Sequence, residues 1–265
     1  MAMTPRRRAR LSRGIQYAVL VVLVGLAAAF ADWTTLREQF FDVDIVLGML
    51  PEVLTVALKN TILYTACGFG FGLVLGLVLA LMRLSSVGPY RWLATGFIEF
   101  FRGLPALVVF IALSVGVPLA FPGREIPGGV LGVVTLALGL VGGAYMAETI
   151  RAGIQSVPRG QYEAARSLGM THTWAMVSII IPQAFRIILP PLTNELVLLF
   201  KDSSLVLFLG VTLEERELSK YGRDLASTTA NSTPILVAGL CYLLVTIPLG
   251  FVVRRMEAKA QEAVK

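Results

Sequence analysis

The sequence predicts an all-α protein that crosses a membrane several times. Of its 265 residues, 56% are hydrophobic and only 15% are charged, and the mean hydropathy is +0.75. A soluble domain carries about a quarter charged residues. Several apolar stretches reach the roughly 20 residues that a helix needs to cross a bilayer. The alternating ten-residue segments of a transmembrane barrel are absent.

The first apolar stretch, residues 14–31, follows the basic side chains of Arg6, Arg7, Arg8, Arg10 and Arg13. This pattern also fits a secretory signal, because Ala29-Phe30-Ala31 resembles a cleavage site of small residues. The stretch is longer than the usual apolar core of a signal, which favours an uncleaved transmembrane helix. Residues 32–52 are acidic on balance, and we expect them on the outer side of the membrane.

Five further spans are expected, at residues 53–82, 94–119, 128–150, 190–213 and 234–253. Before the fifth, residues 172–189 are typical of a helix with an apolar face, broken at Pro182. We expect the fifth span to begin at Pro190-Pro191, because proline is well tolerated at the first position of a helix. The chain is therefore predicted to have six spans.

The charges orient these spans. With the N-terminus inside, one side of the membrane carries most of the cations: Arg6 to Arg13, Arg83, Arg91, Arg102, Arg151, Arg159, Arg166, Arg186, Arg254, Arg255, Lys259 and Lys265. The other side keeps only Arg37, Arg124, Arg216, Lys220 and Arg223. Because positive charge accumulates in cytoplasmic loops, we expect both termini in the cytoplasm.

The composition argues against several other functions. The net charge of +6 is not pooled in one basic domain, so nucleic acid is not an expected partner. Cys67 and Cys241 both lie inside apolar stretches, which argues against a disulfide framework or a zinc site. His172 is the only histidine, so a metal centre or a nucleophile–histidine pair has almost no residues to form it. We expect no metal and no cofactor on this chain.

The longest inner connection contains a polar segment, GQYEAARSLGM, at residues 160–170. Pro158 suits the start of a helix and Gly169 its end. Glu163 and Arg166 are three residues apart and are expected to pair, whereas Ala164 and Ala165 keep another face narrow. Such a short helix can enter a groove on a partner protein, or it can be an ordinary solvated loop helix.

The same segment resembles a known signature. Glu163-Ala164-Ala165, then Gly169, then Ile179-x-Ile181-Pro182 is similar to the "EAA" loop of ATP-binding-cassette (ABC) importer permeases, with Ile181 where leucine is usual. Other runs resemble the polar amino acid permeases of that family: FRGLP at 101–105, AYMAE at 144–148, RAGIQSVP at 151–158, LPPLTNE at 189–195 and KDSSLV at 201–206. The similarity covers roughly residues 50–255.

The resemblance implies a type I importer fold: a five-helix transmembrane domain at 51–256, preceded by a basic tail, an extra helix and an outer segment at 1–50 and followed by a cytoplasmic tail at 257–265. It implies a prokaryotic plasma membrane protein for amino acids of the glutamate, glutamine, arginine or histidine type. It also implies a second permease copy or paralogue, cytoplasmic ATPase subunits, an extracytoplasmic binding protein and surrounding membrane lipid as partners. The coupling residues would be Glu163, Ala164, Ala165, Arg166 and Gly169.

In that scheme ATP binds the partner subunit, and the absence of a G-x-x-x-x-G-K-[ST] phosphate loop here agrees with it. The chain itself is then not an enzyme. A self-sufficient secondary transporter or channel for small polar solutes is the alternative, although no inverted internal repeat is visible. Which amino acid is carried, and whether the permease pair is homodimeric, stay open.

The expected fifth span contains polar residues on one face: Asn194, Glu195, Lys201 and Asp202. Counted from Pro190, Lys201 and Asp202 would lie about 16 Å along the helix, near mid-bilayer, where charged side chains usually face a bundle interior or a watery cavity. They could line a substrate path or form a structural ion pair. Glu148 is a further candidate contact for a substrate amine, although a structural pair with Arg151 is the simpler reading.

Overall fold

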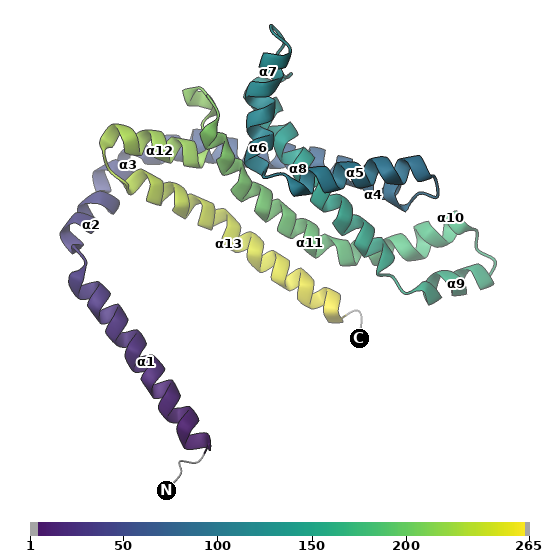
Figure 1. The fold of residues 1–265 in the computed structure, drawn as a ribbon, viewed down its shortest axis with the longest axis horizontal. Coiled ribbons are helices and arrows are strands. Elements are labelled where there is room, and N and C mark those ends of the chain that lie inside the picture. The colour runs from purple at the N-terminus through teal and green to yellow at the C-terminus, as the bar shows by residue number, and fades with distance from the viewer. Residues whose placement is uncertain (1–4, 263–265) are drawn as a thin grey trace. The chain divides into compact units, whose positions relative to one another are not determined.

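The computed structural model describes the backbone of residues 5–262 and the side chains of residues 12–259, and every element in that range is helical. The side chains of Arg6 to Arg10 and the whole of Lys265, counted above among the inner charges, lie outside it. The described chain contains five helices long and apolar enough to cross a membrane, or six if a bent pair is one span. The expected fold class is confirmed, and Figure 1 shows the order of the helices.

The chain divides into two compact units, one ending at Val43 and the other beginning at Asp44. The first contains α1 (Pro5–Phe30) and α2 (Trp33–Phe40). The indole Nε1 of Trp33 donates to the carbonyl of Ala28 at 2.7 Å, and Asp32 caps α2 by accepting from the backbone and hydroxyl of Thr35. These two donated hydrogen bonds lower the pKa of Asp32. The turn between the two helices is thus fixed locally.

The second unit is built on two long helices that lie in close contact, α4 (Lys59–Leu84) and α8 (Gly129–Gln155). Glycines on both helices let the backbones approach. A Cβ placed on Gly72 would lie 3.2 Å from the carbonyl oxygen of Gly139, and one on Gly76 would lie 2.9 Å from that of Gly143. Small residues at a helix interface allow this approach in a membrane, where association depends on packing.

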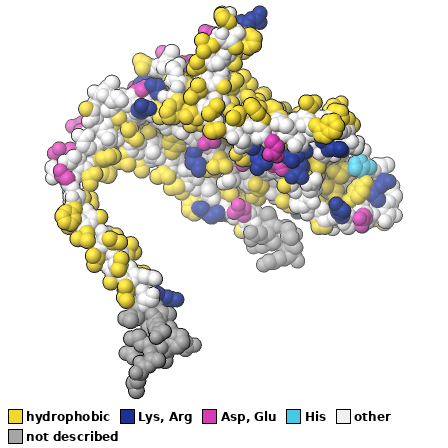
Figure 2. All heavy atoms as spheres, viewed as in Figure 1, with side chains coloured by type: hydrophobic (Ala, Val, Ile, Leu, Met, Phe, Trp, Pro, Cys, Tyr) yellow, Lys and Arg dark blue, Asp and Glu magenta, His cyan; other side chains and the backbone are white. Residues whose placement is uncertain are grey.

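The main core surrounds α8, with Phe110, Leu138 and Met146 fully buried at its centre. It collects side chains from α4, α6 (Ala106–Ile111), α8 and α11 (Ile181–Asp202). A smaller cluster joins α3 (Val43–Glu52) and the π-helical turn η1 (Val53–Leu58) to α12 (Leu218–Thr229) and α13 (Thr233–Glu262). Many large hydrophobic side chains of the second unit are exposed, and Figure 2 shows them spread over the visible face, as contact with lipid requires.

The expected span at 94–119 is not one continuous helix. The chain forms α5 (Gly88–Gly103), turns at Leu104, and continues as α6, η2 (Ala112–Gly116) and α7 (Val117–Ala120), with a bend of 103° between the two parts. Leu104 adopts an extended conformation, with φ −91° and ψ 137°, because the ring of Pro105 disfavours a helical residue before it. In Figure 1 the α6–α7 arm stands away from α5.

The expected start of the fifth span at Pro190 is also wrong. After α10 (His172–Ala175) and the π-helical turn η3 (Met176–Ile180), α11 begins at Ile181 and runs through both prolines. Pro182 occupies the first turn of the helix, where its missing N–H costs nothing. Pro190 is buried against the core, so packing with neighbouring helices offsets the hydrogen bonds that the two prolines remove.

We expect Gly76→Leu to destabilise the second unit by about 1–3 kcal/mol, because the new side chain would collide with the backbone of α8. Gly70→Leu on the same helix is the matched control, since nothing lies within 4 Å of its Cβ position. Thermal unfolding of the detergent-solubilised variants measures the difference. Equal midpoints for the two variants would contradict the close contact between α4 and α8.

Candidate functional site

The polar segment forms a short helix, α9 (Arg159–Ser167), between the end of α8 and the start of α10. Pro158 precedes it, and Gly169 ends it with a φ of +84°, a conformation that glycine adopts readily. The N–H of Gly169 bonds the carbonyl of Arg166 at 3.0 Å, and that of Met170 bonds Ala165 at 3.2 Å. Both expected helix ends are therefore confirmed.

One face of α9 packs inward and the other is open. Ala165 is buried, whereas Glu163, Ala164 and Arg166 are exposed. Leu168, just after the helix, is 85% exposed, an unusual position for a leucine on a polar segment. The expected pair between Glu163 and Arg166 is wrong: within the described chain their side chains form no ion pair, and Arg166 instead donates to the carbonyl of Met170.

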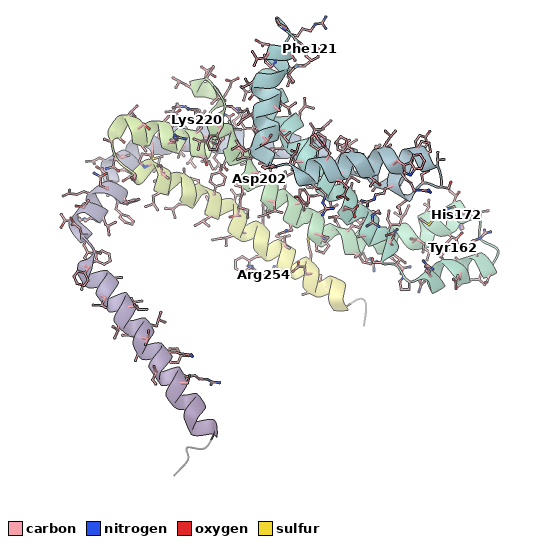
Figure 3. The ribbon with its side chains drawn as sticks, viewed as in Figure 1. Phe121, Tyr162, His172, Asp202, Lys220 and Arg254 are labelled. Atoms are coloured by element: carbon pink, nitrogen blue, oxygen red, sulfur yellow. The ribbon has the colours of Figure 1, made fainter. Side chains whose placement is uncertain are left out.

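The loop that carries α9 is closed by a contact between Tyr162 and His172. The tyrosine hydroxyl lies 2.9 Å from Nδ1 of His172, and the two rings meet edge to face with centroids 5.6 Å apart. Figure 3 shows this pair at the end of the molecule where α9 and α10 lie. The only histidine thus connects the two short helices across their loop, and its surroundings are those of a structural contact.

The polar residues of α11 lie elsewhere along the helix than expected. Asp202 is the last residue of this 22-residue helix, so Lys201 and Asp202 are about 30 Å along the axis from Ile181. The expected distance of about eleven residues from the helix start is wrong, because α11 begins at Ile181 and not at Pro190. The depth of Lys201 and Asp202 in the membrane stays a prediction. Asn194 and Lys201 are seven residues apart, as are Glu195 and Asp202, so the members of each pair lie two turns apart on the same face of the helix. Figure 3 marks Asp202 far from the Tyr162–His172 pair.

None of these four side chains forms a hydrogen bond or a close ion pair within the described chain, although the charges of Lys201 and Asp202 interact electrostatically. Asn194 and Lys201 are exposed and Glu195 and Asp202 are half-buried. The alternative of a structural pair between Lys201 and Asp202 is therefore not seen. Their role as a substrate path stays a prediction.

Glu148 is held between two arginines. Its carboxylate contacts the guanidinium of Arg83 at the end of α4 and accepts from Nη2 of Arg151 at 2.7 Å. The three residues join the C-terminal ends of α4 and α8. The geometry supports the structural pair with Arg151, and sequence spacing did not reveal Arg83. A contact with a substrate amine stays a prediction.

A second polar network, which the sequence did not reveal, ties the loop before α12 to α4. Asn60 donates to the carbonyls of Glu214 and Arg216, at 2.7 and 3.0 Å, and Tyr64 donates to that of Glu215 at 2.8 Å. The hydroxyl of Thr61 accepts from the N–H of Leu218. No local pattern could have found these contacts, since about 150 residues separate the partners.

Glu217 is buried beside this network and caps α12. Its carboxylate accepts from the N–H groups of Ser219 and Lys220, at 2.7 and 2.6 Å, and from the hydroxyl of Tyr242 at 2.7 Å. Burial raises the pKa of Glu217, and the donated hydrogen bonds oppose that rise. Nearby, Arg216 bonds Glu52 at 2.9 Å and lies over the ring of Tyr221. The loop before α12 is thus held by hydrogen bonds to α4 and by an ion pair to α3.

With this geometry in place, comparison with known proteins decides the family. Residues 72–262 match the model of the binding-protein-dependent transport system inner membrane component. The chain belongs to this family. The several apolar helices of the permease agree with that description. The description also agrees with the expected location in a prokaryotic inner membrane. This family match does not favour the alternative of a self-sufficient transporter. Separately, no cluster of metal ligands occurs in the described part of the permease.

The relatives are amino acid permeases. The permease is 38% identical to the probable glutamine ABC transporter permease protein of Bacillus subtilis over 207 residues, which cover 77% of this chain and 91% of that protein. It is 34% identical to the glutamate/aspartate import permease protein of Escherichia coli O157:H7, covering 83% and 98% of the two chains. The resemblance inferred from the sequence is confirmed.

Solved structures of ABC transporters have a similar fold. A crystal structure of an amino acid ABC transporter with histidines has a TM-score of 0.71 and 35% identity, covering 82% of this chain and 98% of that one. A bacterial alginate ABC transporter has a TM-score of 0.65 at 15% identity, covering 98% and 100% of the chains. The second likeness shows the fold alone.

We expect Glu217→Ala to destabilise the permease by about 2 kcal/mol, because two N–H groups of α12 and the hydroxyl of Tyr242 lose their acceptor. Glu214→Ala is the matched control, because the network uses only the backbone carbonyl of Glu214. Thermal unfolding in detergent measures both. If Glu217→Ala were as stable as the control, the buried cap would not stabilise α12.

Proposed function

We propose that this permease is the membrane subunit of an ATP-driven importer of polar amino acids of the glutamate, glutamine, arginine or histidine type. The names of the relatives support the substrate class. The single observation that carries the proposal is α9, a short exposed helix held between the ends of two spans and matching the "EAA" signature. A second permease copy or paralogue and an extracytoplasmic binding protein complete the assembly.

ATP is bound and hydrolysed on a separate cytoplasmic chain, and this chain performs no chemistry of its own. Its proposed parts are the extra helical region at 1–50, the transmembrane domain at 51–256 and a cytoplasmic tail at 257–265. Both termini and α9 lie in the cytoplasm. The excess of Lys and Arg on that side supports this orientation.

The coupling role follows from how α9 is attached. The exposed Glu163, Ala164, Arg166 and Leu168 face outward and dock on the ATPase, while the buried Ala165 and the Tyr162–His172 contact hold α9 against its loop. Gly169 lets the chain reverse direction. Because α9 follows α8 directly and precedes α11, a displacement of α9 is passed to both spans as a rigid-body movement, one of the usual modes of switching.

The polar face at the end of α11 forms part of the substrate path. Asn194, Glu195, Lys201 and Asp202 offer a donor, two carboxylates and a cation without internal partners. A zwitterionic amino acid needs both charges matched when it leaves water. Glu148 is the weaker candidate, since Arg83 and Arg151 already neutralise it.

We expect Leu168→Ser to weaken binding of the ATPase at least about tenfold, because the apolar area of an exposed leucine would no longer be buried on docking. Leu119→Ser is the matched control, since this leucine of α7 is 75% exposed at the other end of the unit. Co-purification with the partner ATPase, at equal membrane insertion, measures the effect. Unchanged recovery with Leu168→Ser would contradict docking through α9.

We expect Lys201→Ala and Asp202→Ala to raise the KM for amino acid uptake about tenfold or more, because each removes a charged contact to the substrate. ATPase co-purification should stay normal in both. Lys59→Ala, which removes an exposed lysine at the start of α4, is the control. Uptake kinetics in proteoliposomes decide the point, and unchanged kinetics in both variants would remove the α11 face from the path.

A further inference from the structure

A cleft of about 800 Å³ lies at the end of the second unit next to α9. Three segments line it: the junction of α8 and α9, the first half of α11, and the end of α13. Its lining residues are Ser156, Val157, Pro158, Gln161, Gln183, Arg186, Ile187, Leu189, Pro190, Met256 and Lys259. Two of the family-like runs, RAGIQSVP and LPPLTNE, contribute residues to the lining, but the proposed substrate path does not use this cleft.

The charges in the cleft are all of one sign. Arg186 comes from α11 and Lys259 from α13, and no Asp or Glu is among the lining residues. Glu257 lies on α13 about 160° around the helix from Lys259, so it faces another direction. Within the described chain neither Arg186 nor Lys259 forms an ion pair. Two uncompensated cations in one cleft favour an anionic ligand.

Polar groups surround these cations. The amides of Gln161 and Gln183 and the hydroxyl of Ser156 can hydrogen-bond a ligand, although Gln183 already donates to the carbonyl of Ile179 at 2.9 Å. Pro158 and Gln161 belong to the N-terminal turn of α9, so the positive end of its helix dipole also lies at the cleft. Each feature adds to the preference for negative charge.

The rest of the lining is apolar, and the cleft lies between two membrane spans. Val157, Ile187, Leu189, Pro190 and Met256 form this part, with Met256 joined to Thr193 of α11 by a contact of 3.7 Å. Lys259 lies in the last turn of α13, which ends at Glu262. A ligand that enters here therefore meets cations at the end of a span and apolar side chains between two spans.

We propose that this cleft binds the headgroup of an anionic phospholipid from the inner leaflet. Basic pockets between transmembrane helices on the cytoplasmic side suit such headgroups. The phosphate lies between Arg186 and Lys259, and the glycerol and upper acyl chain lie on the apolar wall. Because the same cleft includes the first turn of α9, the lipid braces the coupling helix against α11 and α13. The inference rests on the proposed cytoplasmic position of α9.

The test compares Arg186→Gln/Lys259→Gln with Arg255→Gln, which removes an exposed cation of α13 that does not line the cleft. Native mass spectrometry of the permease–ATPase complex measures the phosphatidylglycerol retained after titration. Each cation near the membrane surface is expected to contribute about fivefold, so the double variant should bind this lipid about 25-fold more weakly. The charge-preserving variant Arg186→Lys/Lys259→Arg should restore binding.

A functional arm uses vesicles of phosphatidylcholine alone or with phosphatidylglycerol. Uptake by the wild-type complex should rise with the anionic lipid, and this rise should be lost in Arg186→Gln/Lys259→Gln and kept in Arg255→Gln. Equal loss in Arg255→Gln would overturn the proposal, since surface charge in general would then suffice. Lipid retained by the permease alone but not by the complex would also overturn it, because the ATPase would then occupy the cleft.

The two proposals can fail separately. If the wild-type complex took up no amino acid in any vesicle, the proposed function would fall, while the lipid titration would still report on the cleft. If uptake were normal but indifferent to phosphatidylglycerol, and the double variant retained the lipid unchanged, the lipid site alone would be wrong.

Discussion

The glycine-lined contact between α4 and α8 is the constraint on which the second unit depends. In lipid there is no hydrophobic force between helices, so association rests on how closely their surfaces meet. Gly72 and Gly76 on one helix, and Gly139 and Gly143 on the other, remove the side chains that would keep the backbones apart. Larger residues then fill the margins, as Leu138 does against Gly68. Once α4 and α8 are joined, α6 and α11 have a fixed surface against which to pack.

The same close packing continues toward α9. Gly153, near the end of α8, receives the side chain of Ile188 from α11, so the two helices that flank the α9 loop already touch before the loop begins. At the same end, Glu148 joins α8 to Arg83 of α4. A force on α9 therefore meets a set of spans already connected to one another. In the proposed coupling role, rigid connection at this point would convert a small displacement of α9 into movement of whole helices, because packed interfaces deform little before they shift as units.

The sequence predicted the elements whose signals are local. Apolar length gave the spans, and Pro158 and Gly169 gave both ends of α9, because a proline and a glycine act on the backbone within one or two residues. Two of the failures concern prolines whose effect depends on neighbours. Pro105 bends the chain by 103°, whereas Pro190 and Pro191 leave α11 continuous, since Pro190 is buried against the core. A one-dimensional pattern cannot distinguish these outcomes. The hydrogen bonds that join Asn60, Thr61 and Tyr64 to the distant loop could not be predicted from a local pattern either.

The polar side chains of the second unit divide into two groups. One group is satisfied internally: Glu217 accepts three hydrogen bonds, and Glu148 lies between two arginines. The other group, at the end of α11, has charged side chains that form no hydrogen bond and no ion pair in the described chain. Isolated charge away from water is costly, so it persists only where water, a ligand or a partner meets it. Internal pairing therefore identifies the parts that hold the helices together, and its lack at Asn194, Glu195, Lys201 and Asp202 is the reason to propose this face as part of the substrate path.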